Sequence, residues 1–334
     1  MLFNNKKMRT FAIGLMLTAA FGILGCGGDS KESGKKAEKV NVGIVQLVEH
    51  EALDAANKGF VDGLASKGYK EGENITFDRQ NAQADQSNLQ NIAHRFVNNK
   101  VNLICAIATP AAQTVANVTS DIPVVATAVT DYKTAKLVKD NDKPGTNVTG
   151  TTDMNPVAEQ LDLLLKLVPD AKTIGTIYCS SEVNSQLQVE ILKKAAADKG
   201  VTVKEATVSN VNDIQQAARS LTGQVQAVYV PTDNVLASAI STLLTVTEEE
   251  KLPVICGEAA LVKAGGLATL GVDYYKLGFQ AGEMAADILG GKSKPENMPI
   301  QAQKDFKPTI NMKEAAKIGV KVSEDVLKGA DVIK

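Results

Sequence analysis

One stretch of the sequence, TIGTIYCSSEVNSQ at 173–186, carries side chains that could act as nucleophiles. An apolar run ends at Cys179, and Ser180 follows at once. Catalysis by either side chain needs a base within reach, usually histidine, and a third group that orients the base. The chain has only two histidines, His50 and His94, and this turn lacks the glycines of the G-x-S-x-G nucleophile elbow. A surface hydrolase is therefore the weaker hypothesis, and a group of side chains that only holds a ligand is the stronger one.

The elements that would position this turn form a repeated α/β pattern. Short apolar runs alternate with amphipathic helical patterns from Val40 onward, which indicates a parallel sheet covered on both faces. The second half repeats the first: TIGTIYCSSEVNSQ corresponds to VNVGIVQLVEHEAL, and VQAVYVPTDNVLASAI corresponds to VNLICAIATPAAQTVA. The sequence therefore predicts two Rossmann-like α/β lobes with parallel sheets.

Polar residues gather just past the ends of the expected strands in both halves. Ligands of open parallel sheets bind outside the carboxyl ends of the strands, and interfaces between domains are preferred places for small molecules. If the lobes face one another, these residues line one cleft. The expected ligand-binding residues are Gln46, Leu47, Glu49, His50, Thr109, Pro110, Ala111, Thr127, Ala128 and Thr130 in the first half, Ser180, Ser181, Asn184, Thr232, Asp233, Asn234 and Glu258 in the second, and Asp273 at a link between them.

Three segments are expected to cross between the lobes. KPGTNVTGTTD links them near 145–153, LATLGVDYYKLG begins a second link near 267–274, and PIQAQKDFKPTINM provides a third. Such a hinge lets two rigid lobes close around a ligand. The expected lobes are 40–147 plus 274–302 for the N-terminal lobe, and 148–273 plus 303–334 for the C-terminal lobe.

The first residues have the layout of an export signal. Positive residues precede the uncharged apolar run TFAIGLMLTAAFGILG, which predicts a signal peptide over 1–25. The ILGC ending resembles the bacterial lipobox, which implies lipid attachment at Cys26 and an extracytoplasmic protein anchored to the cell membrane. An ordinary signal peptide cleaved nearby, or an uncleaved anchor, is the alternative. Residues 26–39 would form a flexible tether.

Composition excludes several classes of function. The formal net charge is −2 and no basic patch is interleaved with aromatic residues, so nucleic acid is not an expected partner. Cys105, Cys179 and Cys256 each lie in or at the end of an apolar run and are expected to be buried small hydrophobes. No CxxC or Cys/His spacing predicts a metal site, and no cofactor is expected.

Several motifs together resemble one family of binding proteins. VGIVQLVEHEALDAANKGFVDGL, ATPAAQTVAN, PGTNVTGTTD, SSEVNSQ, VPTDNVLASAI and GVDYYKLGFQAGEMAADIL resemble the substrate-binding lipoproteins related to the tryptophan/tyrosine importer components, which have the type I periplasmic-binding-protein fold. The resemblance covers roughly Val40 to Lys334. It implies a monomer that binds a small molecule without catalysis and delivers it to an ABC permease. An aromatic amino acid is the favoured ligand; a branched-chain amino acid, a nucleoside, or ligand sensing for a receptor are the alternatives.

An amino acid would need partners for its carboxylate, its ammonium and its side chain. Thr109 as a helix cap, with Pro110 as the first helical residue, would place helix N–H groups near the carboxylate, and Thr127 or Thr130 would add a hydroxyl. An ammonium in a closed cleft needs a carboxylate, and the candidates, in order, are Asp233 and Asp273, then Glu258. The side chain would pack against Leu47, Tyr132, Tyr274 or Tyr178.

Overall fold

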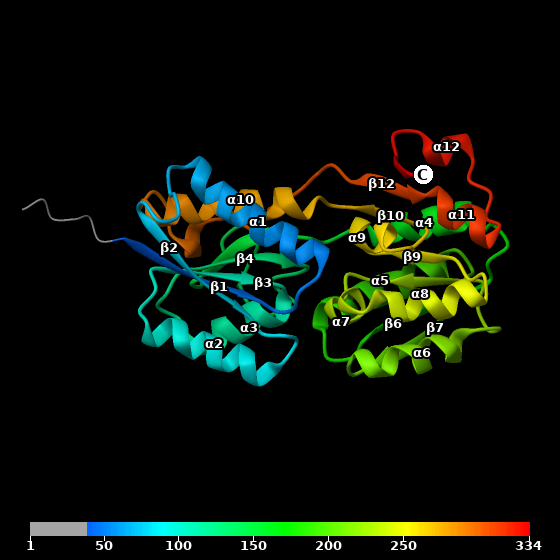
Figure 1. The fold of residues 1–334 in the computed structure, drawn as a ribbon, viewed down its shortest axis with the longest axis horizontal. Helices are drawn as coiled ribbons and strands as arrows, with labels where there is room; N and C mark the ends of the chain where they lie inside the picture. Colours follow the sequence, from blue (N-terminus) through cyan, green and yellow to red (C-terminus); the bar gives the residue numbers. More distant parts are fainter. Residues whose placement is uncertain (1–38) are drawn as a thin grey trace, which may run out of the picture. The chain divides into compact units, whose positions relative to one another are not determined.

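Two lobes, each built around one β-sheet, make up the computed structural model, which describes residues 39–334 (Figure 1). The expected α/β class with largely parallel sheets is confirmed. The predicted signal peptide and the proposed lipid site at Cys26 lie outside the described residues.

The first lobe has a six-stranded sheet in the order β11-β5-β4-β3-β1-β2, with every neighbouring pair parallel. Its strands are apolar where helices cover both faces, and β3 is buried at every position. Its elements are β1 (Val40–Gln46), α1 (Glu51–Ser66), β2 (Ile75–Asn81), α2 (Gln86–Asn98), β3 (Leu103–Ile107), α3 (Thr109–Val118), β4 (Val124–Val129), β5 (Val148–Thr152), α10 (Tyr274–Leu289), the 3₁₀ turn η2 (Pro295–Asn297) and β11 (Gln301–Ala302).

The second lobe has a seven-stranded sheet in the order β13-β12-β10-β9-β8-β6-β7. Only the β10–β12 pair is antiparallel. Its elements are α4 (Val157–Leu167), β6 (Thr173–Cys179), α5 (Val183–Asp198), β7 (Thr202–Val208), the 3₁₀ turn η1 (Val211–Asp213), α6 (Ile214–Leu221), β8 (Ala227–Val230), α7 (Asn234–Ser238), α8 (Ile240–Glu249), β9 (Val254–Cys256), α9 (Ala259–Lys263), β10 (Ala268–Gly271), β12 (Lys307–Asn311), α11 (Met312–Ile318), α12 (Glu324–Leu327) and β13 (Asp331–Ile333).

Strand β5 differs from the expected division of the chain, which places residue 148 at the start of the second lobe. β5 pairs with β4 on one side and β11 on the other, so it belongs to the first sheet. Its threonines make it look like a polar linker, but their hydroxyls are satisfied inside the lobe. Thr149 donates to the Met298 carbonyl at 2.7 Å, and Thr151 donates to the Thr127 hydroxyl at 2.9 Å.

Helices α1 and α10 pack closely because glycines face one another between them. A Cβ added at Gly278 would lie 1.9 Å from the Ala56 carbonyl oxygen, and one at Gly63 would lie 2.1 Å from the Phe279 carbonyl oxygen. Figure 1 shows the two helices side by side over the first sheet. Because α10 begins at Tyr274, this packing also fixes the place where the second link enters the first lobe.

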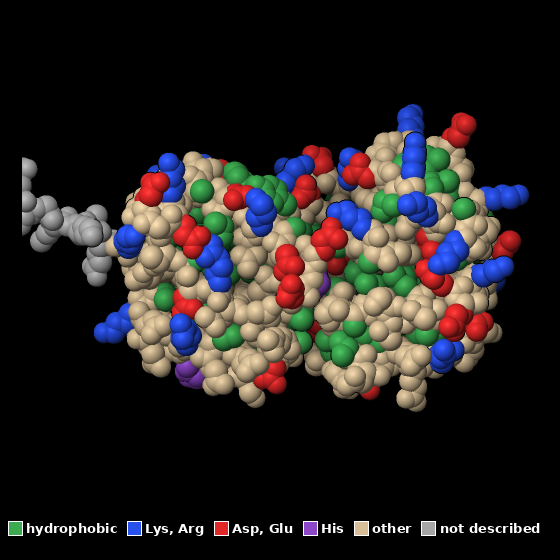
Figure 2. Space-filling view, in the orientation of Figure 1, with side chains coloured by type: hydrophobic (Ala, Val, Ile, Leu, Met, Phe, Trp, Pro, Cys, Tyr) green, Lys and Arg blue, Asp and Glu red, His purple; other side chains and the backbone are tan. Residues whose placement is uncertain are grey.

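The chain crosses between the two sheets three times, at 153–156, 272–273 and 303–306. Residues 39–334 contain no helix with the length and hydrophobicity needed to traverse a bilayer. On the face shown in Figure 2, acidic and basic side chains are interspersed over both lobes, which matches the mixed charge of the sequence.

Candidate functional site

A small cavity lies between the two lobes, at the carboxyl ends of their central strands. Its free volume is about 10 Å³, so the lobes are closed on one another. It is lined by His50, Leu53, Ala128, Asp153 and Tyr274 from the first lobe and the links, and by Thr232, Asp233, Asn234 and Glu258 from the second lobe. Seven of these are among the residues expected from the sequence: His50, Ala128, Thr232, Asp233, Asn234, Glu258 and, as a wall for the ligand's side chain, Tyr274.

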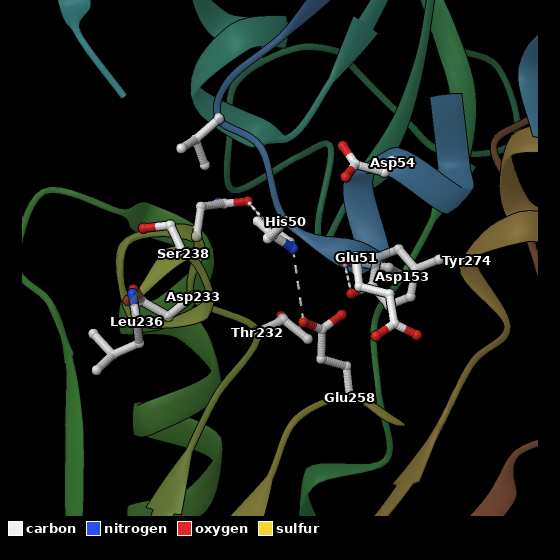
Figure 3. A network of polar contacts seen from close by, with 12 residues as sticks. His50, Glu51, Asp54, Asp153, Thr232, Asp233, Leu236, Ser238, Glu258 and Tyr274 are labelled. Atoms are coloured by element: carbon white, nitrogen blue, oxygen red, sulfur yellow. Dashed lines mark hydrogen bonds and ion pairs between the residues drawn. The ribbon is translucent and has the colours of Figure 1, made fainter. Parts of the chain in front are cut away.

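His50 spans the cavity from the turn between β1 and α1. Its Nε2 atom lies 3.5 Å from Oδ1 of Asn234, and its Nδ1 atom lies 4.0 Å from Oε1 of Glu258 (Figure 3). Burial lowers the pKa of His50, and the hydrogen bond with Asn234 only partly opposes this. The imidazole is therefore mostly neutral near pH 7, and its contact with Glu258 is not a charged pair.

Glu258 presents a buried carboxyl group without a close partner. It occupies the N-cap position of α9, but its side chain does not cap that helix. It is 2% exposed, and within the described residues its Oε2 atom has no hydrogen-bond partner. Burial, together with the negative charge of Asp153, raises the pKa of Glu258 to about 8. A positively charged group placed here would gain a strong partner.

Asp153 is a second buried carboxyl group of the cavity, and it is not among the residues expected from the sequence. Its Oδ1 atom accepts from the Thr130 hydroxyl at 2.9 Å, and its Oδ2 atom accepts from the Tyr274 hydroxyl at 2.6 Å. Burial raises its pKa, while these two hydrogen bonds favour the ionised form. The available clue was its position: an acidic residue at the end of PGTNVTGTTD, where the first link leaves the sheet.

Asp233 lines the cavity, but its carboxyl oxygens are bonded to two turns of the second lobe. Its Oδ2 atom accepts from the Cys179 N–H at 2.6 Å and from the Ser185 hydroxyl at 2.7 Å. Its Oδ1 atom accepts from the Leu236 N–H at 2.9 Å and caps α7. With these contacts made, the geometry does not favour the ammonium role expected for Asp233.

Glu182 connects the same two turns from the other side, because it lies after β6 and binds the start of α7. Its carboxylate accepts from the backbone N–H groups of Asn234 at 3.1 Å and Val235 at 3.2 Å, at the start of α7. Burial, together with the nearby carboxylate of Asp233, raises the pKa of Glu182 to about 8. Asp233 and Glu182 together join the turn after β6 to the turn after β8. These hydrogen bonds hold Thr232 and Asn234 at the cavity.

Asp273 lies on the hinge, outside the cavity. Its side chain is about half exposed and caps α10 by accepting from the Lys276 N–H at 3.1 Å. Its own N–H donates to Oε1 of Gln303 at 3.0 Å, which joins two of the crossing segments. Asp273 therefore makes a hinge hydrogen bond through its backbone, and its side chain caps a helix.

The start of α3 also differs in detail from the expected helix cap. The helix begins at Thr109 itself, and the N-cap is Ala108, whose φ is 88° and which offers no capping side chain. The Thr109 hydroxyl is therefore buried without a partner in the described chain. Pro110 and Ala111 complete a first turn whose N–H groups have no intrahelical acceptor, so this end favours negative charge.

The remaining expected residues do not line the cavity. The Gln46 side chain bonds to Val48, Asp54 and Asn57, and Leu47 is in the core. The Thr127 hydroxyl bonds to Thr151, and the Thr130 hydroxyl donates to Asp153. Glu49, Ser180 and Ser181 are exposed, whereas Asn184 is buried beside Glu182 and its Oδ1 atom has no partner among the described residues. A sequence pattern locates strand ends, but it does not separate side chains that point into the cavity from those that hold its turns.

Of the expected tyrosines, only Tyr274 reaches the cavity. The Tyr132 hydroxyl contacts the Ala126 carbonyl at 2.9 Å inside the first lobe, and the Tyr178 hydroxyl donates to Glu205 at 2.8 Å on the outer part of the second sheet. Leu53, from α1, supplies an apolar wall and was not among the residues expected to bind the ligand.

Cys179 does not have the environment of a nucleophile. Burial raises the pKa of its thiol, whereas a reactive cysteine needs a lowered pKa. Cys105, Cys179 and Cys256 are all free and buried, as expected. Across residues 39–334, no three His, Cys, Asp or Glu side chains are grouped so that they could hold a metal ion.

The sequence model of the family described as "ABC transporter substrate binding protein" matches residues 41–334. The chain belongs to this family. Its members bind substrates for transporters and are not enzymes, and they act outside the cytoplasm.

Two relatives with similar sequences are described by an aromatic amino acid that they bind. A tyrosine-binding protein of Clostridioides difficile is 44% identical over 306 residues, which are 92% of this chain and 85% of the relative. The crystal structure of an ABC domain from Streptococcus pneumonia in complex with L-Trp is 39% identical, with a TM-score of 0.86, and the match covers 89% of this chain and 100% of that one.

A third relative gives a comparison of lobe arrangement. The ligand-free, open structure of a substrate-binding protein with adhesive properties from Clostridium difficile is 43% identical, and the match covers 88% of this chain and 99% of that one. Its TM-score is 0.68, lower than that of the L-Trp complex although its sequence is slightly closer. The closed cavity is consistent with this difference.

Proposed function

We propose that this substrate-binding protein captures an aromatic amino acid between its lobes and delivers it to an ABC permease. The observation that carries the ligand assignment is the unpartnered carboxyl group of Glu258, buried in the inter-lobe cavity. Two relatives, one named tyrosine-binding and one solved with L-Trp, support an aromatic side chain on the ligand. With about 10 Å³ free, the lobes must separate before such a ligand enters.

Two polar groups, Glu258 in the cavity and the start of α3 at the end of β3, match the two charged groups of an amino acid. Glu258 takes the ammonium, in place of Asp233 and Asp273. The first turn of α3 and the free Thr109 hydroxyl receive the carboxylate, because both lack acceptors of their own. Leu53 and Tyr274 are the apolar and aromatic walls available to the ligand's side chain.

The proposed cellular setting includes a lipid anchor. The ILGC sequence at 23–26 supports lipid attachment at Cys26 after removal of residues 1–25, and residues 26–39 would tether the binding lobes to the outer face of the cell membrane. We propose a monomer that contacts its permease from this position. Mass spectrometry of the membrane-extracted protein tests the anchor by the mass of the lipid on its N-terminal cysteine.

Calorimetry of the ligand-stripped protein with the twenty amino acids and the common nucleosides tests the ligand assignment. Tyrosine or tryptophan should bind without turnover and stabilise the protein. Glu258→Gln should weaken that binding by about 10- to 100-fold, since a buried hydrogen bond to a charged group contributes about 1.5–3 kcal/mol.

Glu314→Gln is the matched control, because Glu314 is also a mostly buried glutamate but lies on α11, away from the cavity. It should bind like the unmodified protein. A branched-chain amino acid or a nucleoside that binds while tyrosine and tryptophan do not would show that the aromatic assignment is wrong.

A further inference from the structure

We propose that the lobes close only when the charge of Glu258 is neutralised, either by a proton or by the ligand's ammonium group, so that ligand binding releases a proton. This inference rests on the proposed function. It adds that the protein's affinity for its ligand depends on pH through a residue of the cleft itself.

Among residues 39–334, no cation close to Glu258 is placed to neutralise it. The titratable and charged groups that face it come from four other places in the fold: His50 and Glu51 at the start of α1, Asp153 after β5, Lys263 at the end of α9, and Tyr274 at the start of α10. The only permanent cation among them is Lys263. Its side chain is 58% exposed, and its amino group pairs with Glu51 at 2.6 Å, so it serves another carboxylate.

The titratable neighbours that line the cavity with Glu258 are His50, Asp153, Asp233 and Tyr274, and only the histidine could carry positive charge. His50 has a lowered pKa and hydrogen-bonds Asn234, so it stays mostly neutral near pH 7. Burial raises the pKa of Asp153, but the hydroxyls of Thr130 and Tyr274 both donate to it and favour its ionised form. Glu258, which has no such donors, is the group that must take up a proton when the cavity closes without a ligand (Figure 3).

A ligand ammonium brings the same single positive charge as that proton. When it enters, the carboxyl proton of Glu258 passes to the solvent and the ammonium keeps all of its protons, so the charge of the Glu258–ammonium pair equals that of the protonated Glu258. The ligand's own carboxylate adds one negative charge, which the proposed function places at the start of α3. The raised pKa of Glu258, about 8, agrees with this exchange at neutral pH.

Calorimetry of the full-length protein with L-tyrosine and L-tryptophan at pH 7, in phosphate and in Tris, measures the proton count directly. These buffers differ in their heat of ionisation, so a released proton appears as a difference in the measured binding enthalpy. We expect close to one proton released per ligand, and an affinity that rises by nearly tenfold per pH unit between about pH 6 and about pH 7.5, then levels off above about pH 8.

Equal enthalpies in the two buffers, with an affinity that does not change with pH, would overturn the inference while leaving the proposed function intact. If neither amino acid bound at any pH, both would be overturned. The measurement on the unmodified protein therefore decides the question without a variant.

Two variants identify the group that carries the proton. Asp153→Asn removes the negative charge that raises the pKa of Glu258, so the rise in affinity should move to lower pH. Glu314→Gln, whose carboxyl pKa is also raised by burial but which lies outside the cleft, should release the same proton as the unmodified protein. An unshifted pH profile in Asp153→Asn would contradict the role given to Glu258.

Discussion

At the scale of residues, the buried carboxyl groups divide by how many donors they have. Asp233 and Glu182 each accept several hydrogen bonds and hold turns of the second lobe. Glu258 is equally buried but has no close donor. A fully bonded carboxylate stabilises the fold, whereas an unpartnered one costs stability and is available to a ligand.

Glu258→Gln should therefore stabilise the ligand-free protein at neutral and higher pH. The folded-state pKa of Glu258, about 8, lies above the ordinary value of 4.5, so between these values the folded chain holds a proton that the unfolded chain has lost. Stability then falls as pH rises through this window, by at most about 1.4 kcal/mol per pH unit. The variant lacks this loss.

Thermal unfolding of both proteins at a series of pH values checks this. The melting temperatures should be close near pH 4.5 and should diverge, in favour of the variant, up to about pH 8. A gap that does not depend on pH would contradict the raised pKa.

The residue scale also shows the limit of prediction from sequence. Strand ends could be located, which brought His50, Asn234 and Glu258 into the expected set. The sequence could not show whether an acidic side chain already has hydrogen-bond partners. The partners of Asp233 are Cys179 and Ser185, about fifty residues earlier in the chain. Sequence alone gives no sign of such distant hydrogen bonds.

At the scale of elements, the α1–α10 pair positions one side of the cleft. His50 precedes α1 and Tyr274 begins α10, so the spacing of these helices sets the distance between two residues of the cavity. The glycines between them allow the helix backbones to approach closely.

Gly278→Ala should destabilise the protein by about 1–3 kcal/mol, since its Cβ would lie 1.9 Å from the Ala56 carbonyl oxygen and the helices would have to separate. Ligand affinity should fall with it, because Tyr274 moves with α10. Gly290→Ala is the matched control. It lies at the C-cap of the same helix, where the nearest atom to an added Cβ is 3.2 Å away. Chemical denaturation measures the free energy of unfolding of both variants. An equal loss of stability in the two would contradict the packing argument.

Prediction of the elements succeeded for the long hydrophobic runs and failed for the threonine-rich strand β5. The run TIGTIYC at 173–179 coincides with β6. Strand β5 lies within the link expected near 145–153. Its Thr149 and Thr151 are buried and bonded to groups from other elements. A buried hydroxyl and an exposed one look the same in a sequence.

At the scale of the whole molecule, a charged contact at the surface joins the lobes. Lys263 at the end of α9 pairs with Glu51 at the start of α1 at 2.6 Å, and both side chains are more than half exposed. Exposed pairs of this kind contribute about 0.2–1 kcal/mol and are screened by salt. The contact therefore favours closure only slightly.

Lys263→Glu should shift the ligand-free protein toward an open arrangement. Repulsion between the two carboxylates should reduce ligand affinity by about two- to fivefold at low salt and less at high salt. Lys307→Glu is the matched control, because Lys307 pairs with Asp331 at the same 2.6 Å but within the second lobe. Small-angle X-ray scattering of the ligand-free proteins measures the opening. A radius of gyration equal to that of the control would argue against the contact's role in closure.

The three crossings have a consequence for how the chain is completed during synthesis. The first lobe lacks α10 and β11 until residue 302 has been made, and the second lobe lacks β12 and β13 until residues 307–333 have followed. A chain stopped after residue 273 would therefore leave both sheets uncovered or unfinished. Neither lobe can reach its final form ahead of the other by more than the last few dozen residues, so the protein should acquire its structure late and nearly all at once.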